Sequence, residues 1–169
     1  MHACLLYALN SPLNKAGFLS IDIHTINDVV IRVNPKVRIP KNFNRFIGLI
    51  EQLFKFKKVP PKKEYLLKIE EIRLDELIRS YKGSEFFILS EHGKPYNREK
   101  MFKVFRGNKS VVLLIGAFHR GEFGKQIEKL TPNKIKIDSE TLDSAIVVSA
   151  IINAYEYAIN LDKMRMNLS

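Results

Sequence analysis

The sequence has a single cysteine, Cys4, and no tryptophan among its 169 residues. One cysteine cannot form a disulfide within the chain, and it excludes a zinc site built from several cysteines. The most apolar stretches, residues 111–116 and 145–159, are too short or too interrupted by polar side chains to cross a bilayer. No charged and then apolar leader opens the sequence. We therefore expect a cytoplasmic protein without a membrane partner, with Cys4 as a buried thiol.

Acidic residues are scarce in one part of the sequence. Residues 34–68 contain ten lysines and arginines but only two acids, and the whole chain carries a formal net charge of +10. A basic segment of this density is typical of a surface that binds a polyanion. Because no Trp-rich or Leu-rich exposed face is expected here, RNA is a better partner than a membrane. The alternative is that these cations only form a solvated face.

A loop with two prolines leads from this basic segment into a predicted helix. Pro40 suits the first turn of a helix, so we place the helix start near Lys41. Lys41 and Arg45 share one side of this helix, and Arg38 precedes them on the loop. Three cations beside a helix N-terminus form a candidate binding site for phosphate groups. Large apolar residues recur at three- and four-residue steps and predict one buried helical face, namely Phe43, Phe46, Ile47, Ile50, Leu53 and Phe54.

Strand and helix patterns alternate along the rest of the chain. The predicted strands cover residues 18–25, 29–33, 65–69, 86–89, 111–115 and 135–137. The other predicted helices cover residues 2–10, 74–81, 97–105 and 142–161, and residues 90–95 are predicted to form a turn-rich loop. The first two strands predict a hairpin. The all-apolar strand at 111–115 indicates a mostly parallel sheet with helices on both faces, so we expect one α/β domain over residues 1–169.

A loop bounded by Gly116 and Gly121 follows the most apolar strand, at the end where open α/β sheets bind ligands. Two glycines five residues apart are weak evidence alone, because a tight turn would require them equally well. No lysine followed by serine or threonine comes after Gly121, which excludes the phosphate loop of a nucleotide hydrolase. The loop also contains His119 and Arg120, to which we assign no catalytic role.

Three segments resemble the ribosome-biogenesis family of pseudouridine-specific rRNA methyltransferases, the Emg-type or nucleolar essential protein family of the knotted SPOUT class. They read LNSPLNKAGFLSIDIHT, NPKVRIPKNFNRFIGLIEQLF and IGAFHRGEF, and the similarity is collinear over nearly all of the chain. The resemblance implies a SPOUT-type α/β fold with a C-terminal trefoil knot, and S-adenosylmethionine as the cofactor. It implies methylation of small-subunit rRNA at nitrogen 1 of a pseudouridine. It also implies a homodimer, because this class builds its active site across two subunits.

The resemblance assigns the cofactor site to three parts of the chain and the RNA contacts to a fourth. Arg38, Lys41 and Arg45 match RNA-contacting positions, although many relatives have arginine in place of Lys41. In the family the cofactor is held largely by backbone groups, so the site should tolerate Thr141 and Leu142 where relatives carry proline and a small apolar residue. The matching cofactor positions are Leu89, Gly116, Gly121, Ile137, Asp138, Ser139, Glu140, Thr141 and Leu142.

The sequence departs most from the family at its start. Relatives carry a first strand, a variable loop and an arginine-proline-aspartate motif before the segment matched by residues 2–10, and this sequence lacks all three. We therefore expect a fold without that first strand, and no residue is identified as the catalytic base. The alternative function is a non-catalytic rRNA-binding assembly factor. Ribosomal assembly proteins are further expected partners, with the nucleolus as the location in a eukaryote.

Overall fold

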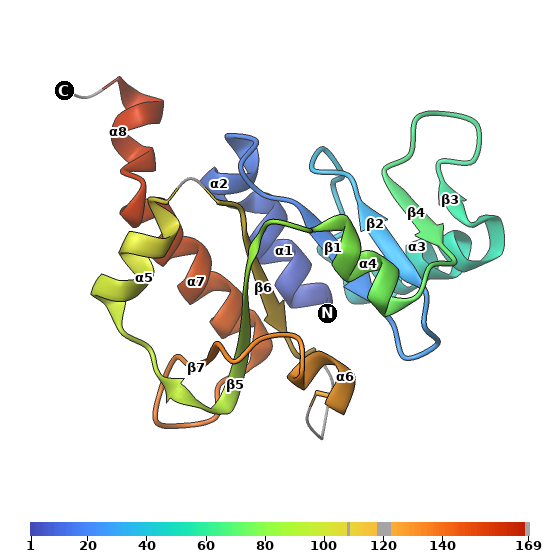
Figure 1. Ribbon diagram of the computed structural model, residues 1–169. Coiled ribbons are helices and arrows are strands. Elements are labelled where there is room, and N and C mark those ends of the chain that lie inside the picture. The colour runs from blue at the N-terminus through green and yellow to red at the C-terminus, as the bar shows by residue number, and fades with distance from the viewer. Residues whose placement is uncertain (108, 118–122, 168–169) are drawn as a thin grey trace. The chain divides into compact units, whose positions relative to one another are not determined.

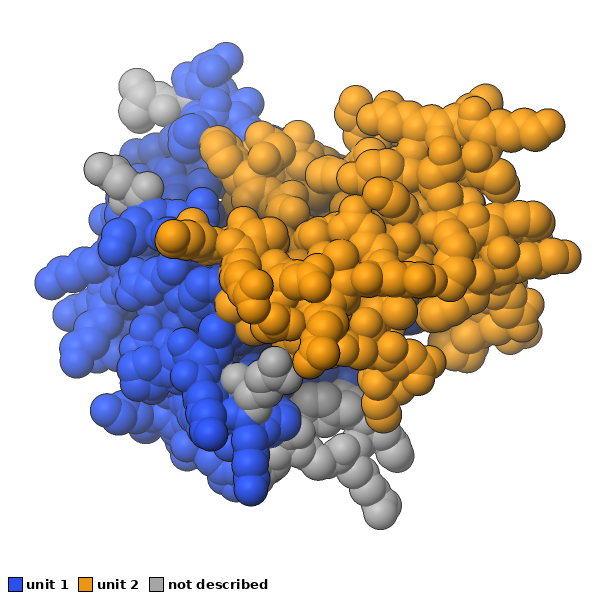
Figure 2. All heavy atoms as spheres, turned by 45° about the vertical axis from the view of Figure 1, so that its right-hand side comes forward, with its two compact units in different colours: residues 1, 83–169 blue, residues 2–82 orange. Residues whose placement is uncertain are grey.

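A computed structural model describes residues 1–107, 109–117 and 123–167 (Figure 1). Contacts divide the chain into two compact units, His2–Lys82 and Gly83–Ser169, the second joined by Met1 (Figure 2). Each unit has its own sheet and its own apolar cluster. The single domain over residues 1–169 stays a prediction, because this division describes contacts and not independent folding. No helix in the described ranges is both long and apolar enough to cross a membrane.

The unit His2–Lys82 contains an antiparallel sheet with the strand order β1-β2-β4-β3. Its strands are β1 (Ile21–His24), β2 (Val30–Val33), β3 (Lys58–Val59) and β4 (Leu67–Glu70). Its helices are α1 (His2–Asn10), α2 (Pro12–Lys15), α3 (Phe43–Phe56) and α4 (Leu74–Ser80). β1 and β2 form the predicted hairpin, in which Ile23 lies opposite Ile31. The expected mostly parallel sheet is wrong for this unit, because all three of its strand pairs are antiparallel.

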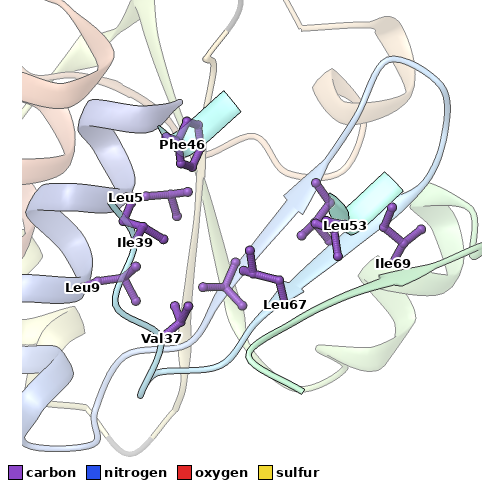
Figure 3. Close-up of a cluster of buried hydrophobic side chains, with 10 residues drawn as sticks. Leu5, Leu9, Val37, Ile39, Phe46, Leu53, Leu67 and Ile69 are labelled. Carbon is purple, nitrogen blue, oxygen red and sulfur yellow. The ribbon is translucent and has the colours of Figure 1, made fainter. Parts of the chain in front are cut away.

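An apolar cluster from α1, the loop before α3, α3 and the sheet forms the core of this unit (Figure 3). Phe46 and Leu53 of α3 are 1% and 0% exposed. Burial of a side chain of this size stabilises the fold by about 1.5–3 kcal/mol. The other labelled members are Leu5, Leu9, Val37, Ile39, Leu67 and Ile69.

The basic segment enters α3 differently from the sequence-based prediction. The helix begins at Phe43 and not at Lys41, because the side-chain oxygen of Asn42 caps it by accepting a 3.1 Å hydrogen bond from the Arg45 N–H. The predicted buried face is also too wide. Phe43, Ile47 and Phe54 are 58%, 40% and 41% exposed, since only the stripe around Phe46 and Leu53 meets the core.

A polar network ties three strands of the antiparallel sheet together. The Arg32 guanidinium on β2 donates to Asp22 on β1 at 2.6 Å and to Glu70 on β4 at 2.7 Å. The Tyr81 hydroxyl also donates to Asp22, and burial is the first cause that raises the pKa of Tyr81 to about 12. This network helps to fix the register of the antiparallel sheet. The loop that follows β2 in this sheet carries the basic residues.

The unit Gly83–Ser169 contains a parallel sheet with the order β6-β5-β7, which confirms the predicted α/β class. Its strands are β5 (Glu85–Pro95), β6 (Val111–Ile115) and β7 (Lys134–Lys136). Its helices are α5 (Arg98–Phe105), α6 (Lys125–Glu128), α7 (Ser144–Ala158) and α8 (Leu161–Met166). Phe105 of α5 and Ile151 of α7 pack in one cluster with Leu89 of β5. The predicted helix over 142–161 is two helices, because Asn160 adopts a left-handed conformation, with φ 52°, after α7.

Candidate functional site

The ends of the parallel strands and the turn before α7 border a pocket of about 300 Å³. The predicted site residues that line it are Leu89, Gly116, Ile137, Asp138, Glu140, Thr141 and Leu142. The structure therefore brings together three segments that are far apart in the sequence. Ser139 is not among the lining residues. Gly121, His119 and Arg120 lie outside the described residues.

β5 continues past the predicted strand end and forms one wall of this pocket. Residues 90–95 belong to β5, which corrects the predicted turn-rich loop. Ile135 of β7 pairs with both Leu89 and Lys94, so residues 90–93 have no register partner on β7. Gly93 permits this arrangement, because a Cβ placed there would lie 2.5 Å from the carbonyl carbon of Ile135.

Sequence reasoning missed the pocket residues that this irregular stretch of β5 contributes, namely Ser90, Glu91 and His92. A signal was available in Gly93, since an isolated glycine in a strand pattern indicates a bulge or a close backbone approach. Ser90 and Pro95 hid that signal, because serine and proline are typical turn residues.

Side-chain hydrogen bonds order the turn before α7. Asp138 accepts from the Glu140 N–H at 3.0 Å and from the Ser139 hydroxyl at 3.2 Å. The backbone hydrogen bond is the first cause that lowers the pKa of Asp138, with the Ser139 hydroxyl second. The Ser139 hydroxyl therefore serves the turn, and Asp138 is held as a carboxylate.

Two further hydrogen bonds connect the walls of the pocket. The Thr141 hydroxyl donates to Glu91 at 2.6 Å and so joins the turn before α7 to β5. The Ser144 hydroxyl, at the start of α7, donates to the Gly116 carbonyl at 2.5 Å, just after β6. Thr141 thus has a specific partner in this chain, which explains how the pocket accommodates a polar residue there.

The charge of the pocket lining opposes that of the protein as a whole. Among the described residues, four carboxylates border the pocket, namely Glu91, Glu128, Asp138 and Glu140, and Lys136 is the one lysine or arginine that lines it. Glu128 is paired with Lys134 at 2.8 Å, and Glu91 lies 3.6 Å from the His92 ring, so Asp138 and Glu140 are the lining carboxylates without an ion pair in the part of the chain that the structure describes. An excess of carboxylates attracts a positively charged small molecule. The described residues contain no group of three or more His, Cys, Asp or Glu arranged to hold a metal ion.

The predicted RNA-contacting residues lie in the other unit, at the start of α3. Arg38 is exposed between Val37 and Ile39, which are both buried, so the alternation of the loop turns its side chain outward. Lys41 and Arg45, on either side of the Asn42 cap, are exposed as well. None of the three forms an ion pair with another residue in the part of the chain that the structure describes. Their charges remain available for an external anion.

Two side chains that sequence reasoning missed hold the loop that carries these cations. Asn14 is buried and its amide donates to the Pro35 carbonyl at 2.9 Å. The His2 ring donates to the Pro40 carbonyl at 2.8 Å and stacks on Phe46, with 4.3 Å between ring centroids. Both contacts join positions more than twenty residues apart, so no local pattern could have indicated them.

Comparison with known proteins identifies relatives over nearly the whole chain. The profile of the family described as EMG1/NEP1 methyltransferase matches residues 1–156. The protein named ribosomal RNA small subunit methyltransferase Nep1 of Thermococcus kodakarensis is 38% identical over 161 residues, which are 95% of this chain and 71% of that protein. The Nep1 protein of Pyrococcus furiosus is 39% identical over 159 residues, covering 94% of this chain and 70% of the relative.

A solved structure shows the same fold. The crystal structure of Archaeoglobus fulgidus Nep1 bound to S-adenosylhomocysteine matches with a TM-score of 0.79 and 27% sequence identity. The match covers 94% of this chain and 69% of that one.

Proposed function

Because the chain belongs to the EMG1/NEP1 methyltransferase family, we propose that it transfers a methyl group from S-adenosylmethionine to nitrogen 1 of a pseudouridine in small-subunit rRNA. The observation that carries the proposal is the meeting of Leu89 and Gly116 with residues 137, 138 and 140–142 in one pocket at the ends of parallel strands. The names of the relatives support rRNA of the small subunit as the substrate class. The pseudouridine specificity rests on the resemblance of the sequence motifs.

The lining of the pocket suits this cofactor. S-adenosylmethionine supplies an electrophilic methyl group on a positively charged sulfonium. Glu91, Asp138 and Glu140 provide negative charge, and Asp138 keeps its charge because its pKa is lowered. The backbone at 137–142 and at 90–93, where β5 has no register partner on β7, offers peptide groups for an adenine edge. The A. fulgidus structure, which is bound to the demethylated product, supports the same ligand class.

The basic residues of α3 and its preceding loop supply the RNA site in this proposal. Arg38, Lys41 and Arg45 would bind phosphate groups, because they are exposed and have no competing acidic partner among the described residues. The reaction also requires the loss of the proton on nitrogen 1 of the base. A target inside an RNA helix must leave the base stack before the reaction, and contacts to its flanking backbone stabilise that state.

The proposal includes a homodimer and the C-terminal knot of the SPOUT class. Ile146 and Tyr157 of α7 are 50% and 70% exposed, and eleven residues bring them to the same side of the helix. A second copy would bury this apolar side, as the two-fold interfaces of homodimers do. Since the substrate is rRNA, the proposed location is the place of ribosome assembly, which is the cytoplasm or, in a eukaryote, the nucleolus.

Methyl transfer from labelled S-adenosylmethionine to small-subunit rRNA tests the proposal. The substrate is rRNA from cells that contain pseudouridine, and an unmodified transcript of the same rRNA is the control. The proposal predicts incorporation into the cellular rRNA alone. Tight rRNA binding without any incorporation would instead support the non-catalytic assembly factor. Equal incorporation into the unmodified transcript would contradict the pseudouridine specificity.

A further inference from the structure

Gly48 lies in the middle of α3, although glycine is the poorest helix former after proline. A Cβ placed on Gly48 would meet no atom within 4 Å among the described residues, and the φ of Gly48 is not positive. Neither packing nor backbone conformation in that part of the chain requires glycine here. Gly48 is half-buried, but the space that a side chain would fill is open, so the backbone here permits close approach by a molecule outside the chain.

Polar side chains surround this opening. Residues three and four positions from Gly48 are its neighbours on the helix surface, namely Asn44, Arg45, Glu51 and Gln52, and Lys55 follows two turns after Gly48. All five are exposed. Within the described residues, their side chains form no hydrogen bond or ion pair, although Lys55 lies 5.4 Å from the ring centroid of Phe56. We call these five residues, with Gly48, the outward face of α3.

The composition of the outward face favours an anionic backbone over a protein surface. Arg45 and Lys55 are cationic and the amides of Asn44 and Gln52 can donate hydrogen bonds, while Glu51 is the one acid. Ile47, an exposed apolar side chain of α3, points to a different side of the helix. The distance from Arg45 to Lys55 along the axis is about 15 Å. A stacked nucleic-acid strand carries about four phosphates over that length, at about 3.4 Å each.

We propose that the outward face of α3 continues the RNA site that begins at Arg38 and Lys41. The phosphate backbone passes over Gly48, where the missing side chain allows it to approach the helix, and Lys55 binds a further phosphate. This inference rests on the proposed rRNA substrate. It adds to it a second group of contacts and assigns a binding role to a residue without a side chain.

The first test compares Gly48→Ala and Gly48→Leu with the parent protein. Alanine favours the helix, so we expect the melting temperature of Gly48→Ala to rise by about 2–4 °C. We expect affinity for transcribed small-subunit rRNA, measured by filter binding, to fall at least about tenfold for Gly48→Leu and less for Gly48→Ala. If Gly48→Ala is more stable than the parent but binds rRNA less well, Gly48 is retained for RNA binding. A glycine required only by the fold would instead lose stability when replaced.

The second test separates a direct contact of Lys55 from the general field of the basic segment. Lys55→Gln should reduce the log–log slope of rRNA affinity against salt by about 0.7–0.9, the value for one lost phosphate contact. Lys62→Gln removes an exposed cation in the same basic segment but outside the outward face, and it should leave the slope close to that of the parent. An equal change in both variants would overturn the assignment of Lys55.

Three further results have defined meanings. If the parent protein binds rRNA and both Gly48 variants bind it equally well, the inference is wrong. The proposed rRNA substrate would still be supported by the binding of the parent. A Gly48→Leu variant that binds rRNA normally but loses its dimer in sedimentation would show that the outward face meets a second copy instead. A parent protein that does not bind the rRNA would refute the proposed function and the inference together. Calorimetry with S-adenosylhomocysteine checks folding, since neither Gly48 nor Lys55 lines the pocket.

Discussion

Replacing Gly93 by alanine should damage the pocket through the backbone and not through a lost side-chain contact. The new Cβ would lie 2.5, 2.6 and 2.7 Å from the backbone C, N and Cα atoms of Ile135. Carbon atoms in contact are normally about 3.5–4.0 Å apart, so β5 and β7 must separate by about 1 Å. Overpacking of this kind costs about 1–3 kcal/mol. For a chain of this size, each 1 kcal/mol lowers the melting temperature by about 2–4 °C.

The same displacement should weaken cofactor binding, because β7 leads directly into Ile137 and Asp138 of the pocket. We expect calorimetry to show S-adenosylmethionine binding at least about tenfold weaker in Gly93→Ala, which corresponds to about 1.4 kcal/mol. Gly48→Ala is the matched control, since the same methyl group there meets nothing within 4 Å. Normal melting and normal affinity in Gly93→Ala would refute the close approach and the position of the ligand beside it.

Three other predictions concern the RNA face, the antiparallel sheet and the dimer. Arg38→Glu with Arg45→Glu should lower the salt slope of rRNA binding by about 1.5 and leave S-adenosylmethionine affinity unchanged; an unchanged slope would mean that these arginines form only a solvated face. The Arg32 hydrogen bond is the first cause that lowers the pKa of Glu70 from 4.5, so the resulting stability is present above about pH 4.5 and is lost as the pH falls through the lower folded value. Urea titrations at several pH values should show that the free energy of unfolding of Arg32→Met no longer falls with the titration of Glu70. The same pH dependence in Arg32→Met and the parent would contradict this prediction. Sedimentation should give about twice 19.6 kDa for the parent and a smaller mass for Tyr157→Asp, whereas a monomeric parent would exclude the proposed dimer.

Local sequence patterns predicted those elements whose signals are local. The bounds of α1 (His2–Asn10) and β6 (Val111–Ile115) agree with the prediction, because an apolar run is closed in one case by Ser11 and Pro12 and in the other by Gly116. Periodicity also placed Phe46 and Leu53 on the buried side of α3. It could not show how wide the buried stripe would be, since that depends on the width of the surface against which the helix packs.

The features that could not be predicted depend on contacts between distant residues. The polar residues at 90–92 resemble a loop, and they remain within β5 because Leu89 and Lys94 on either side of them both pair with Ile135. The hydrogen bond from Thr141 to Glu91 joins residues fifty positions apart. The candidate cofactor residues came from resemblance to a family and not from periodicity, because a site built largely from backbone groups has little side-chain signature.

The most direct test of the central claim is the chemical identity of the product nucleoside. After incubation with S-adenosylmethionine and pseudouridine-containing small-subunit rRNA, the RNA is digested to nucleosides and analysed by liquid chromatography and mass spectrometry against synthetic standards. The account predicts 1-methylpseudouridine with the parent protein and a much lower yield with Gly93→Ala. A methyl group found on another nucleoside, or on a different atom of pseudouridine, would contradict it.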